Sequence, residues 1–363
     1  MIDIHFIQSF TTMSKRVVSK HLFNFRLNGI LDDDIQRYEE NRPKPSGKYL
    51  EALKLLRNEN DEIFVDAMRT IVTADVASKQ QDPMFQKGID ACVHTELKVP
   101  TTHDGMYEVK TLVHTPKSIA DNKSNAALIY AHGGGVVACS AENFKPYLSN
   151  ISAECEVVVF NVNYRLAPEA KCPNNMLDFY ETVKYISSNA QQLNIDPNKI
   201  AIAGESGGGY ICFSTMVFMA QKSESSLVKL AMPNVPMISD YCFTDPMAMT
   251  KEERADVYGL QRIWGTLIPS CFDEQKDDPL LFPSKANDEI LSEMPPTIVW
   301  SAEFDMFLTE TLRMANRLRA CGRLLELVIL PGIKHANNFN PALKCYRLGM
   351  DAYKLAIREY LLN

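Results

Sequence analysis

The sequence lacks an excess of positive charge, and it also lacks long apolar runs. Its 45 acidic residues outnumber the 38 basic ones, which gives a formal net charge of −7. Because such a chain has no general positive field to hold a phosphate backbone, we expect no nucleic-acid partner. No uncharged apolar run reaches the roughly 18 residues that a membrane-spanning helix needs. Stable insertion into a membrane is therefore not expected.

Closely spaced cysteines and a secretory signal are also missing. The nine cysteines are scattered, odd in number and never arranged as a CxxC pair, a pattern typical of free thiols in a reducing compartment. No cysteines or histidines cluster at the spacing of metal ligands, so we expect neither a metal ion nor another cofactor. The sequence begins MIDIHFIQSF, and the acidic, His and Gln side chains in it interrupt the apolar core that a signal peptide needs. We therefore expect a soluble, cytoplasmic protein.

From about Pro116 onward, short β-branched runs alternate with longer helical stretches. This alternation predicts an α/β fold in which helices flank a mostly parallel central sheet. The runs predicted as strands span residues 127–132, 157–164, 200–203, 228–232, 297–301 and 325–330. Two earlier segments, 96–100 and 107–114, are predicted to form an antiparallel pair where the sheet begins. Helices are predicted over 173–189, over 309–321 and at the end of the chain, where apolar residues from Tyr346 to Tyr360 recur in steps of four and three.

Residues 1–95 are helix-like and poor in strands, so they are predicted to form a separate helical segment in front of a main domain over 96–363. An apolar face over 18–25 is flanked by basic residues and is compatible with a helix that lies on a membrane surface. The acidic run at 32–34 would repel anionic lipid, so we favour a helix packed over the main domain. A second strand-poor region, rich in Met, Asp and Pro, spans about 236–294.

A nucleophilic serine is indicated by the segment 204–208, which reads GESGG and matches the pattern G-x-S-x-G. In this pattern small residues let a strand turn sharply into a helix and leave the serine hydroxyl exposed. Three specified positions alone are a weak signal. The context strengthens it, because the predicted strand 200–203 precedes the motif and a helix-compatible stretch over 210–220 follows it. Ser206 is therefore the candidate nucleophile.

A serine needs a base to remove its proton, and histidine suits this role because its pKa lies near neutrality. In this arrangement the chain order is serine, acid, histidine. His335 is the one histidine of seven that follows Ser206, and it lies in a predicted loop directly after a strand. The acid must be a carboxylate that orients the imidazole. Asp305 and Glu303 both follow the predicted strand 297–301, and spacing alone does not choose between them.

Donors for a developing oxyanion are predicted at His132-Gly133-Gly134-Gly135, which follows a predicted strand. Glycines let the backbone approach the substrate and turn its N–H groups inward, and the amide of Gly207 adds another donor. One such hydrogen bond contributes about 2.7 to 4 kcal/mol in the transition state. His132 is interpreted as an anchor that orients this loop, not as a base.

Together these motifs resemble the hormone-sensitive-lipase-like esterases, a branch of the α/β-hydrolases that includes bacterial esterases and arylacetamide deacetylase. The resemblance covers roughly residues 90–363. The segments that carry it are HGGG at 132–135, YRLAPE at 164–169, the elbow at 204–209, AEFD at 302–305 and the loop at 332–335.

The resemblance implies an α/β-hydrolase fold with a helical cap built from residues 1–95 and the insert at about 236–294. It further implies Ser206 as nucleophile, Asp305 rather than Glu303 as acid and His335 as base. The oxyanion donors that it implies are Gly134, Gly135 and Gly207, with Gly133 shaping the approach to them.

The sequence departs from the usual family pattern close to the expected site, so substrate specificity is less well determined than the mechanism. Glu205-Ser206-Gly207 stands where the family usually has Asp-Ser-Ala, and MFLTE at 306–310 replaces Pro-Leu-Arg-Asp-Glu. Ala336-Asn337 replaces Gly-Phe, and Cys139 stands where a glycine is common.

The function expected from these residues is hydrolysis of short- to medium-chain carboxylic esters, small-molecule substrates, through an acyl-enzyme. The same residues could cleave amides, carbamates or lactones, since only the leaving-group pocket differs. A non-catalytic receptor on this scaffold, as in the gibberellin receptors, is disfavoured because those proteins have lost the histidine that His335 supplies here. Both a monomer and a homodimer are compatible with the sequence.

Overall fold

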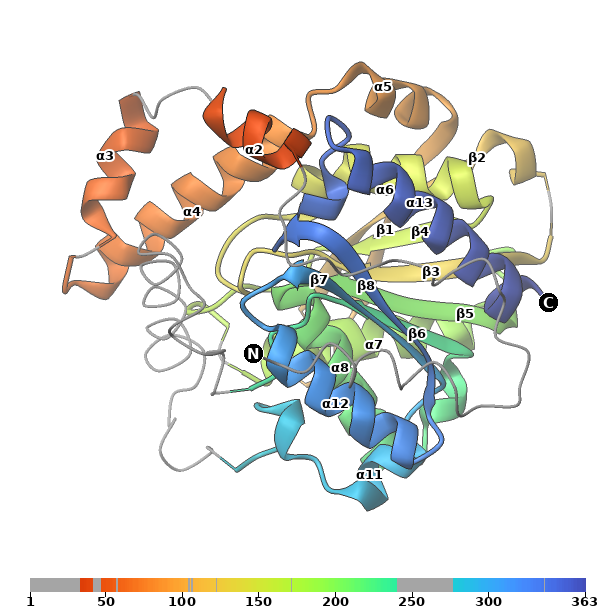
Figure 1. Ribbon diagram of the computed structural model, residues 1–363. Coiled ribbons are helices and arrows are strands. Elements are labelled where there is room, and N and C mark those ends of the chain that lie inside the picture. Colours follow the sequence, from red (N-terminus) through yellow and green to blue (C-terminus); the bar gives the residue numbers. More distant parts are fainter. Residues whose placement is uncertain are drawn as a thin grey trace.

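The computed structural model describes residues 33–41, 47–56, 58–103, 105, 107–121, 123–170, 172–239, 277–335 and 337–363. One eight-stranded sheet runs through the molecule in the order β1-β2-β4-β3-β5-β6-β7-β8 (Figure 1). Its strands are β1 (Cys92–Pro100), β2 (Glu108–Pro116), β3 (Asn125–Ala131), β4 (Val158–Val162), β5 (Ile195–Glu205), β6 (Leu230–Asn234), β7 (Thr297–Phe304) and β8 (Leu324–Lys334). β2 pairs antiparallel with β1 and β4, and the other neighbours pair in parallel. The predicted α/β class and the antiparallel pair are confirmed.

Helices cover both faces of the sheet. The helices of the main domain are α6 (Ala141–Cys155), α7 (Asn174–Ser188), α8 (Gly207–Gln221), α11 (Asp288–Glu293), α12 (Leu308–Ala320) and α13 (Lys344–Ala356). In β3 the side chains of Leu128 and Tyr130 join the core beneath α6 and α13, whereas Ile129 joins the core beneath α7 and α8. Each of the three is at most 2% exposed. A strand buried on both faces reads as a continuous apolar run, which is why the sequence predicts it well.

The bounds of all eight strands differ from the predicted ones, and β5 and β8 extend furthest beyond them. β5 begins at Ile195, five residues before the predicted strand 200–203, because Asn125 of β3 pairs with Ile195 across a register shift. Because the residues after Ile195 read DPNK and are polar, the sequence pattern does not indicate that a strand begins there. β8 continues to Lys334, although a loop was predicted after 325–330, because Phe304 pairs with Lys334 beyond a second register shift. The strand thus ends directly at His335.

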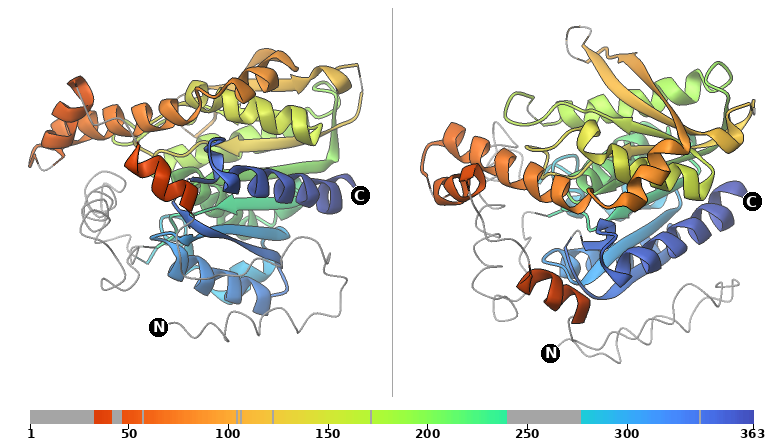
Figure 2. Two further views of the ribbon diagram at one scale, coloured as in Figure 1. Left: turned by 45° about the horizontal axis from the view of Figure 1, so that its top comes forward. Right: turned by 90° about the horizontal axis from the view of Figure 1, so that it is seen from above.

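The described part of the N-terminal segment is helical. It contains α2 (Asp33–Glu40), α3 (Gly47–Leu55), α4 (Asp61–Lys79) and α5 (Pro83–Asp90), and β1 starts at Cys92. Figure 2 shows α3 and α4 extending beyond the sheet on one side. The N–H of Lys344 donates to Asp34 of α2 at 2.7 Å, so α2 lies at the start of α13. The predicted amphipathic face over 18–25 lies outside the described residues.

The predicted insert at about 236–294 is described only in part, because residues 240–276 lie outside the described residues. Its last section packs on the main domain: α11 contacts α8 and α12. Leu281, Phe282 and Leu291 are buried in the same core cluster as the apolar side chains of α8. This section therefore belongs to the helical layer on that face of the sheet.

A buried ion pair fixes the loop between β4 and α7. Asp178 of α7 is fully buried, and its Oδ2 accepts hydrogen bonds from the backbone N–H and the Nε–H of Arg165, both at 2.9 Å. Its Oδ1 accepts from the Arg165 guanidinium at 2.8 Å and lies 3.1 Å from His103 Nε2. A buried charge without its partner is strongly unfavourable. Arg165 and the loop after it therefore depend on Asp178.

We expect Asp178→Ala to lower the free energy of unfolding by about 3–5 kcal/mol, because the substitution leaves the Arg165 guanidinium without its carboxylate. Denaturant titration followed by circular dichroism measures the loss. The matched control is Asp351→Ala on the exposed side of α13, which should change stability by no more than about 0.5 kcal/mol. Equal losses in the two variants would contradict this role for Asp178.

Candidate active site

Ser206 lies at a sharp turn between β5 and α8. Its φ is 56°, a left-handed conformation that is unusual for a residue with a side chain. Two glycines make the turn sterically accessible. A Cβ at Gly204 would lie 2.2 Å from the carbonyl oxygen of Gly208, and one at Gly208 would lie 2.0 Å from that of Ala131. The elbow therefore presses against the end of β3, and no larger residue fits at either position.

The structure brings Ser206, His335 and Asp305 into one hydrogen-bonded series. His335 Nε2 lies 2.9 Å from Ser206 Oγ, and His335 Nδ1 lies 2.8 Å from Asp305 Oδ2. Because a carboxylate only accepts, Nδ1 carries the proton and the lone pair of Nε2 faces the serine hydroxyl. The three residues come from the ends of β5, β8 and β7, which meet at one edge of the parallel sheet.

The two carboxylates that spacing left open have different partners. Asp305 is buried, and its Oδ1 accepts from the N–H of Phe307 at 2.8 Å while its Oδ2 faces the imidazole. Glu303 instead accepts from the N–H of Gly332 at 2.7 Å. Gly332 has a φ of 69° and lies in the section of β8 just before His335. Asp305 is thus the carboxylate that touches His335, and Glu303 braces the turn leading to it.

Opposing influences act on the pKa of His335. Burial lowers the pKa, while the charge of Asp305 and its hydrogen bond raise it, and the net shift is upward. The ring of Phe307 stands edge-on to the imidazole, with the ring centroids 5.1 Å apart. The ring of Phe307 thereby holds the imidazole in place on one side, and Asp305 stabilises its protonated form.

The loop after β3 has an unusual backbone. Gly134, Gly135 and Val136 all have positive φ values, of 120°, 62° and 59°. A Cβ at Gly134 would lie 2.2 Å from the carbonyl oxygen of Ala138, so this position requires glycine. The carbonyl of Gly134 accepts from the N–H of Ala138 at 3.0 Å, which closes the turn.

This loop approaches the elbow at Gly207. A Cβ there would lie 2.6 Å from the backbone nitrogen of Val136 and 2.8 Å from that of Gly135. The usual family alanine at Gly207 would therefore collide with the loop, and the glycine permits the closer approach. The backbone nitrogen of Val136 therefore lies beside the elbow together with that of Gly135, although the sequence analysis did not single out Val136.

His132 lies behind this loop and is fully buried. Its ring stacks on Tyr164 with centroids 4.4 Å apart, and its Nδ1 lies 2.8 Å from the carbonyl oxygen of Gly133. The hydroxyl of Tyr164 donates to the carbonyl of His132 at 2.6 Å. Burial lowers the pKa of His132 to about 4, so the ring is neutral near pH 7. Through these contacts, His132 anchors the loop after β3 to Tyr164.

Glu205 is a further acidic group close to the serine, which the sequence showed only as a departure from the family pattern. Its side chain is 1% exposed, and its Oε2 has no hydrogen-bond partner among the described residues. Burial raises the pKa of Glu205 to about 8, so near pH 7 the carboxyl is mostly protonated. The main negative charge facing His335 is therefore that of Asp305.

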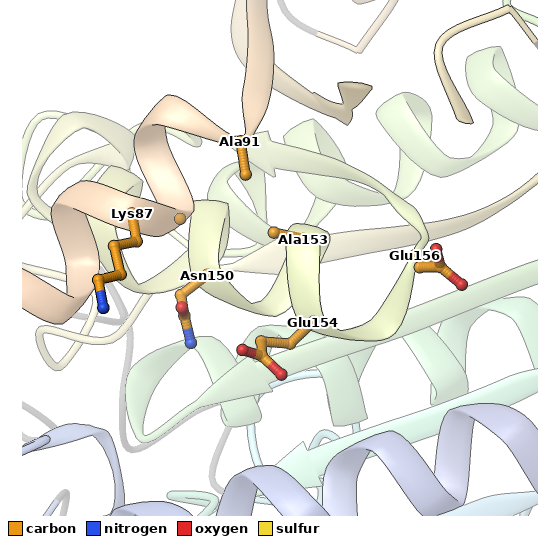
Figure 3. A pocket seen from close by; sticks show the side chains of 7 residues that line it. Lys87, Ala91, Asn150, Ala153, Glu154 and Glu156 are labelled. Atoms are coloured by element: carbon orange, nitrogen blue, oxygen red, sulfur yellow. The ribbon is translucent and has the colours of Figure 1, made fainter. Parts of the chain in front are cut away.

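A pocket of about 430 Å³ lies elsewhere, between α5 and α6 (Figure 3). Its lining includes Lys87, Asn150 and Glu154 and none of the residues in the hydrogen-bonded series. Glu154 is already paired with Lys354 at 2.7 Å. The residues that line this pocket include no nucleophile with an adjacent base.

Within the described residues, no group of three or more His, Cys, Asp or Glu side chains is arranged to hold a metal ion. The same part of the chain contains no helix long and apolar enough to cross a membrane. The cysteines located there are free thiols, while Cys242 and Cys271 lie outside the described residues.

Known proteins are similar to this chain in sequence and in architecture. The carboxylesterase NlhH of Mycobacterium tuberculosis is 26% identical over 244 residues, which cover 64% of this chain and 72% of that protein. The ethyl acetate hydrolase of Pseudomonas putida is 24% identical over 242 residues, covering 65% and 73%. The structure of a bacterial heroin esterase superposes with a TM-score of 0.75 at 26% identity, covering 92% of this chain and 98% of its own.

A family profile described as alpha/beta hydrolase fold matches residues 128–338, more than half of the chain. The matched range contains the elbow, the loop after β3 and all three members of the hydrogen-bonded series. The chain therefore belongs to the α/β-hydrolase fold family, in its hormone-sensitive-lipase-like branch.

Proposed function

We propose that this protein is a serine carboxylesterase that hydrolyses short- to medium-chain carboxylic esters, with Ser206, His335 and Asp305 as its catalytic triad. The observation that carries the proposal is the continuous hydrogen-bonded series from Ser206 Oγ through His335 to Asp305. The names of the relatives support the ester class, since they include a carboxylesterase, an ethyl acetate hydrolase and a heroin esterase. Ethyl acetate is a short ester, which supports the proposed acyl-chain range.

In the proposed acylation step, His335 Nε2 takes the hydroxyl proton while Ser206 Oγ forms a bond to the acyl carbon. Asp305 stabilises the resulting imidazolium. The former carbonyl oxygen becomes an oxyanion, for which the N–H groups of Gly134, Gly135 and Gly207 are the proposed donors. The carbon–oxygen bond to the alcohol then breaks, and His335 returns its proton to the leaving alcohol.

Deacylation repeats this sequence with water. His335 takes a proton from the water, whose oxygen attacks the acyl carbon of the ester on Ser206. Collapse of the second oxyanion intermediate breaks the bond to Oγ and releases the carboxylic acid. His335 gives the proton back to Ser206, and the free enzyme is restored.

The N-terminal helical segment is proposed to form a cap over this site, whereas the described end of the region 236–294, which was also predicted as part of the cap, packs in the helical layer of the main domain. The support for this proposal is that α4 reaches the loop after β3: Arg69 donates to the carbonyl of Val137 at 2.8 Å. α3 and α4 also extend beyond the sheet (Figure 2). A cap in this place would wall the pockets for the acyl and alcohol groups and would set substrate size.

We expect Ser206→Ala to lower kcat/KM for p-nitrophenyl acetate by a factor of roughly 10⁴ or more, because the nucleophile is lost while any oxyanion donors remain. Labelling by a fluorophosphonate probe should disappear in parallel. The exposed Ser226 supplies the control variant Ser226→Ala, which should retain both. Full esterase activity in Ser206→Ala would refute the assignment, and a wild-type protein that resists labelling would favour the non-catalytic receptor.

A substrate panel tests the ester class and the acyl-chain range. We expect kcat/KM to be higher for p-nitrophenyl acetate, butyrate and hexanoate than for the palmitate, and higher for an ester than for its matched anilide. The physical reason for the second expectation is that an amine is a poorer leaving group than a phenolate. Faster cleavage of the anilide would establish the amidase alternative, and preference for palmitate would refute the chain-length proposal.

The role of Asp305 predicts both a rate and a pH effect. Asp305→Asn should lower kcat by a factor of roughly 10⁴, because the imidazole loses its orienting carboxylate. The acid limb of kcat/KM reports the pKa of the base, which must be neutral to accept a proton. In the wild type this midpoint should lie above 6.5 because the pKa of His335 is raised. In Asp305→Asn it should move to lower pH, since burial then acts without the opposing charge.

The matched control is Glu303→Gln, whose amide oxygen can still accept from the N–H of Gly332. Its kcat should stay within about tenfold of the wild type, and its pH midpoint should not move, because the carboxylate hydrogen-bonded to the imidazole is that of Asp305. If Glu303→Gln lost the larger activity, or if Asp305→Asn left the pH midpoint in place, the two carboxylates would have to exchange roles.

A further inference from the structure

We infer that Arg69 of α4 is a positioning residue for the oxyanion loop, so that docking of this N-terminal helix is required for full catalytic rate. The inference rests on the proposed function, because it assigns a role in the same reaction. Arg69 lies outside the range 128–338 that matches the family profile. Two of its acceptors, Ala167 and Glu169, belong to the YRLAPE segment at 164–169 within that range.

One guanidinium connects three parts of the molecule. Arg69 Nε donates to the carbonyl of Val137 at 2.8 Å, and one terminal nitrogen donates to the carbonyl of Ala167 at 3.2 Å. The two terminal nitrogens also donate to the two carboxylate oxygens of Glu169, at 2.9 and 2.6 Å. α4, the loop after β3 and the loop after β4 are therefore held together by a single side chain.

The loop after β3 needs such support because its backbone is strained. Val136 is β-branched and has a φ of 59°, a conformation that a side chain of this shape disfavours. Strained backbone persists only where its surroundings hold it in place. Here the carbonyl of Val136 accepts from the N–H of Ala167 at 2.9 Å, and Arg69 holds the carbonyls of Val137 and Ala167 on either side of that bond.

The nitrogens that this support positions are those next to the nucleophile. The backbone nitrogen of Val136 and that of Gly135 face Gly207, immediately after Ser206. A shift at Val137 would move these N–H groups relative to an oxyanion on the substrate. Donors of this kind act mainly in the transition state, so their displacement should lower kcat more than it changes KM.

The ion pair with Glu169 is not the part that matters for this inference. The side chain of Glu169 is 64% exposed, and solvent-exposed ion pairs contribute little. The bonds to the two backbone carbonyls are different, because they require the planar fork of a guanidinium that reaches several acceptors at once. Lysine offers a single point charge in its place. Arg69→Lys is therefore expected to behave as a loss of function despite keeping the charge.

The test compares Arg69→Ala, Arg69→Lys and Glu169→Gln with the wild type in full-length protein. With p-nitrophenyl acetate, both Arg69 variants should lose roughly 10- to 100-fold in kcat, with KM within about threefold, as expected for slightly misplaced oxyanion donors. Glu169→Gln should stay within about threefold of the wild-type kcat. Added guanidinium ion at low millimolar concentration should restore part of the activity of Arg69→Ala, and it should not activate the wild type.

A second measurement separates positioning from general loss of structure. Inhibition by a trifluoromethyl ketone, which mimics the oxyanion after addition of Ser206, should weaken in Arg69→Lys by the same factor as kcat. The unfolding midpoint of Arg69→Lys shows whether the protein remains folded, and this variant replaces Arg69→Ala if the latter does not fold. Wild-type kcat in Arg69→Lys, a change in KM alone, or equal losses in Glu169→Gln and the Arg69 variants would overturn the inference.

Failure of the proposed function gives a different result. In that case the wild type would be no more active than Ser206→Ala, and no series of Arg69 variants could be ranked by ester hydrolysis. If the wild type is active and Arg69→Lys matches it in both kcat and inhibitor affinity, the carboxylesterase proposal stands and the positioning role of Arg69 is refuted.

Discussion

Close backbone contact between the elbow and the end of β3 is the constraint on which the site depends. The Cβ positions of Gly204 and Gly208 are filled by carbonyl oxygens, of Gly208 and of Ala131 respectively. Because the elbow is pressed this tightly against the sheet, Ser206 adopts a positive φ, and its hydroxyl projects to where the neighbouring strands end. The same compression brings Gly207 against the loop after β3. A side chain at Gly204, Gly207 or Gly208 would push the elbow away and separate Ser206 from the backbone nitrogens of Gly135 and Val136.

Burial determines which of the charged groups near Ser206 carry charge. Desolvation lowers the pKa of His132 and raises that of Glu205, so both are neutral near pH 7. Asp305 is also buried, but it accepts hydrogen bonds from the N–H of Phe307 and from the imidazole of His335. Burial lowers the pKa of His335, but the charge of Asp305 and its hydrogen bond raise it, and the net shift is upward. Asp305 is thus the group whose contact with His335 favours the protonated imidazole.

The family, the fold class and the series of strands were predictable from the sequence because they depend on local pattern. Strands such as β3 are buried on both faces and read as apolar runs, and His335 was found by chain order. From the sequence, Asp305 could be chosen over Glu303 as the acid only by family resemblance, since both follow the same predicted strand. Asp305 contacts His335 and Glu303 contacts Gly332 because their side chains point in different directions, which spacing along the chain does not reveal.

Arg69 shows why part of the site was not predictable at all. It is separated by 68 residues from Val137, and its three acceptors are two carbonyls and one exposed carboxylate, none of which forms a motif with it. The matched range 128–338 contains the proposed chemistry, whereas the residue that braces its strained loop comes from the preceding helical segment. The segment that we propose as a cap is then constrained at one point. Its sequence can vary only as long as α4 continues to place a guanidinium at Val137.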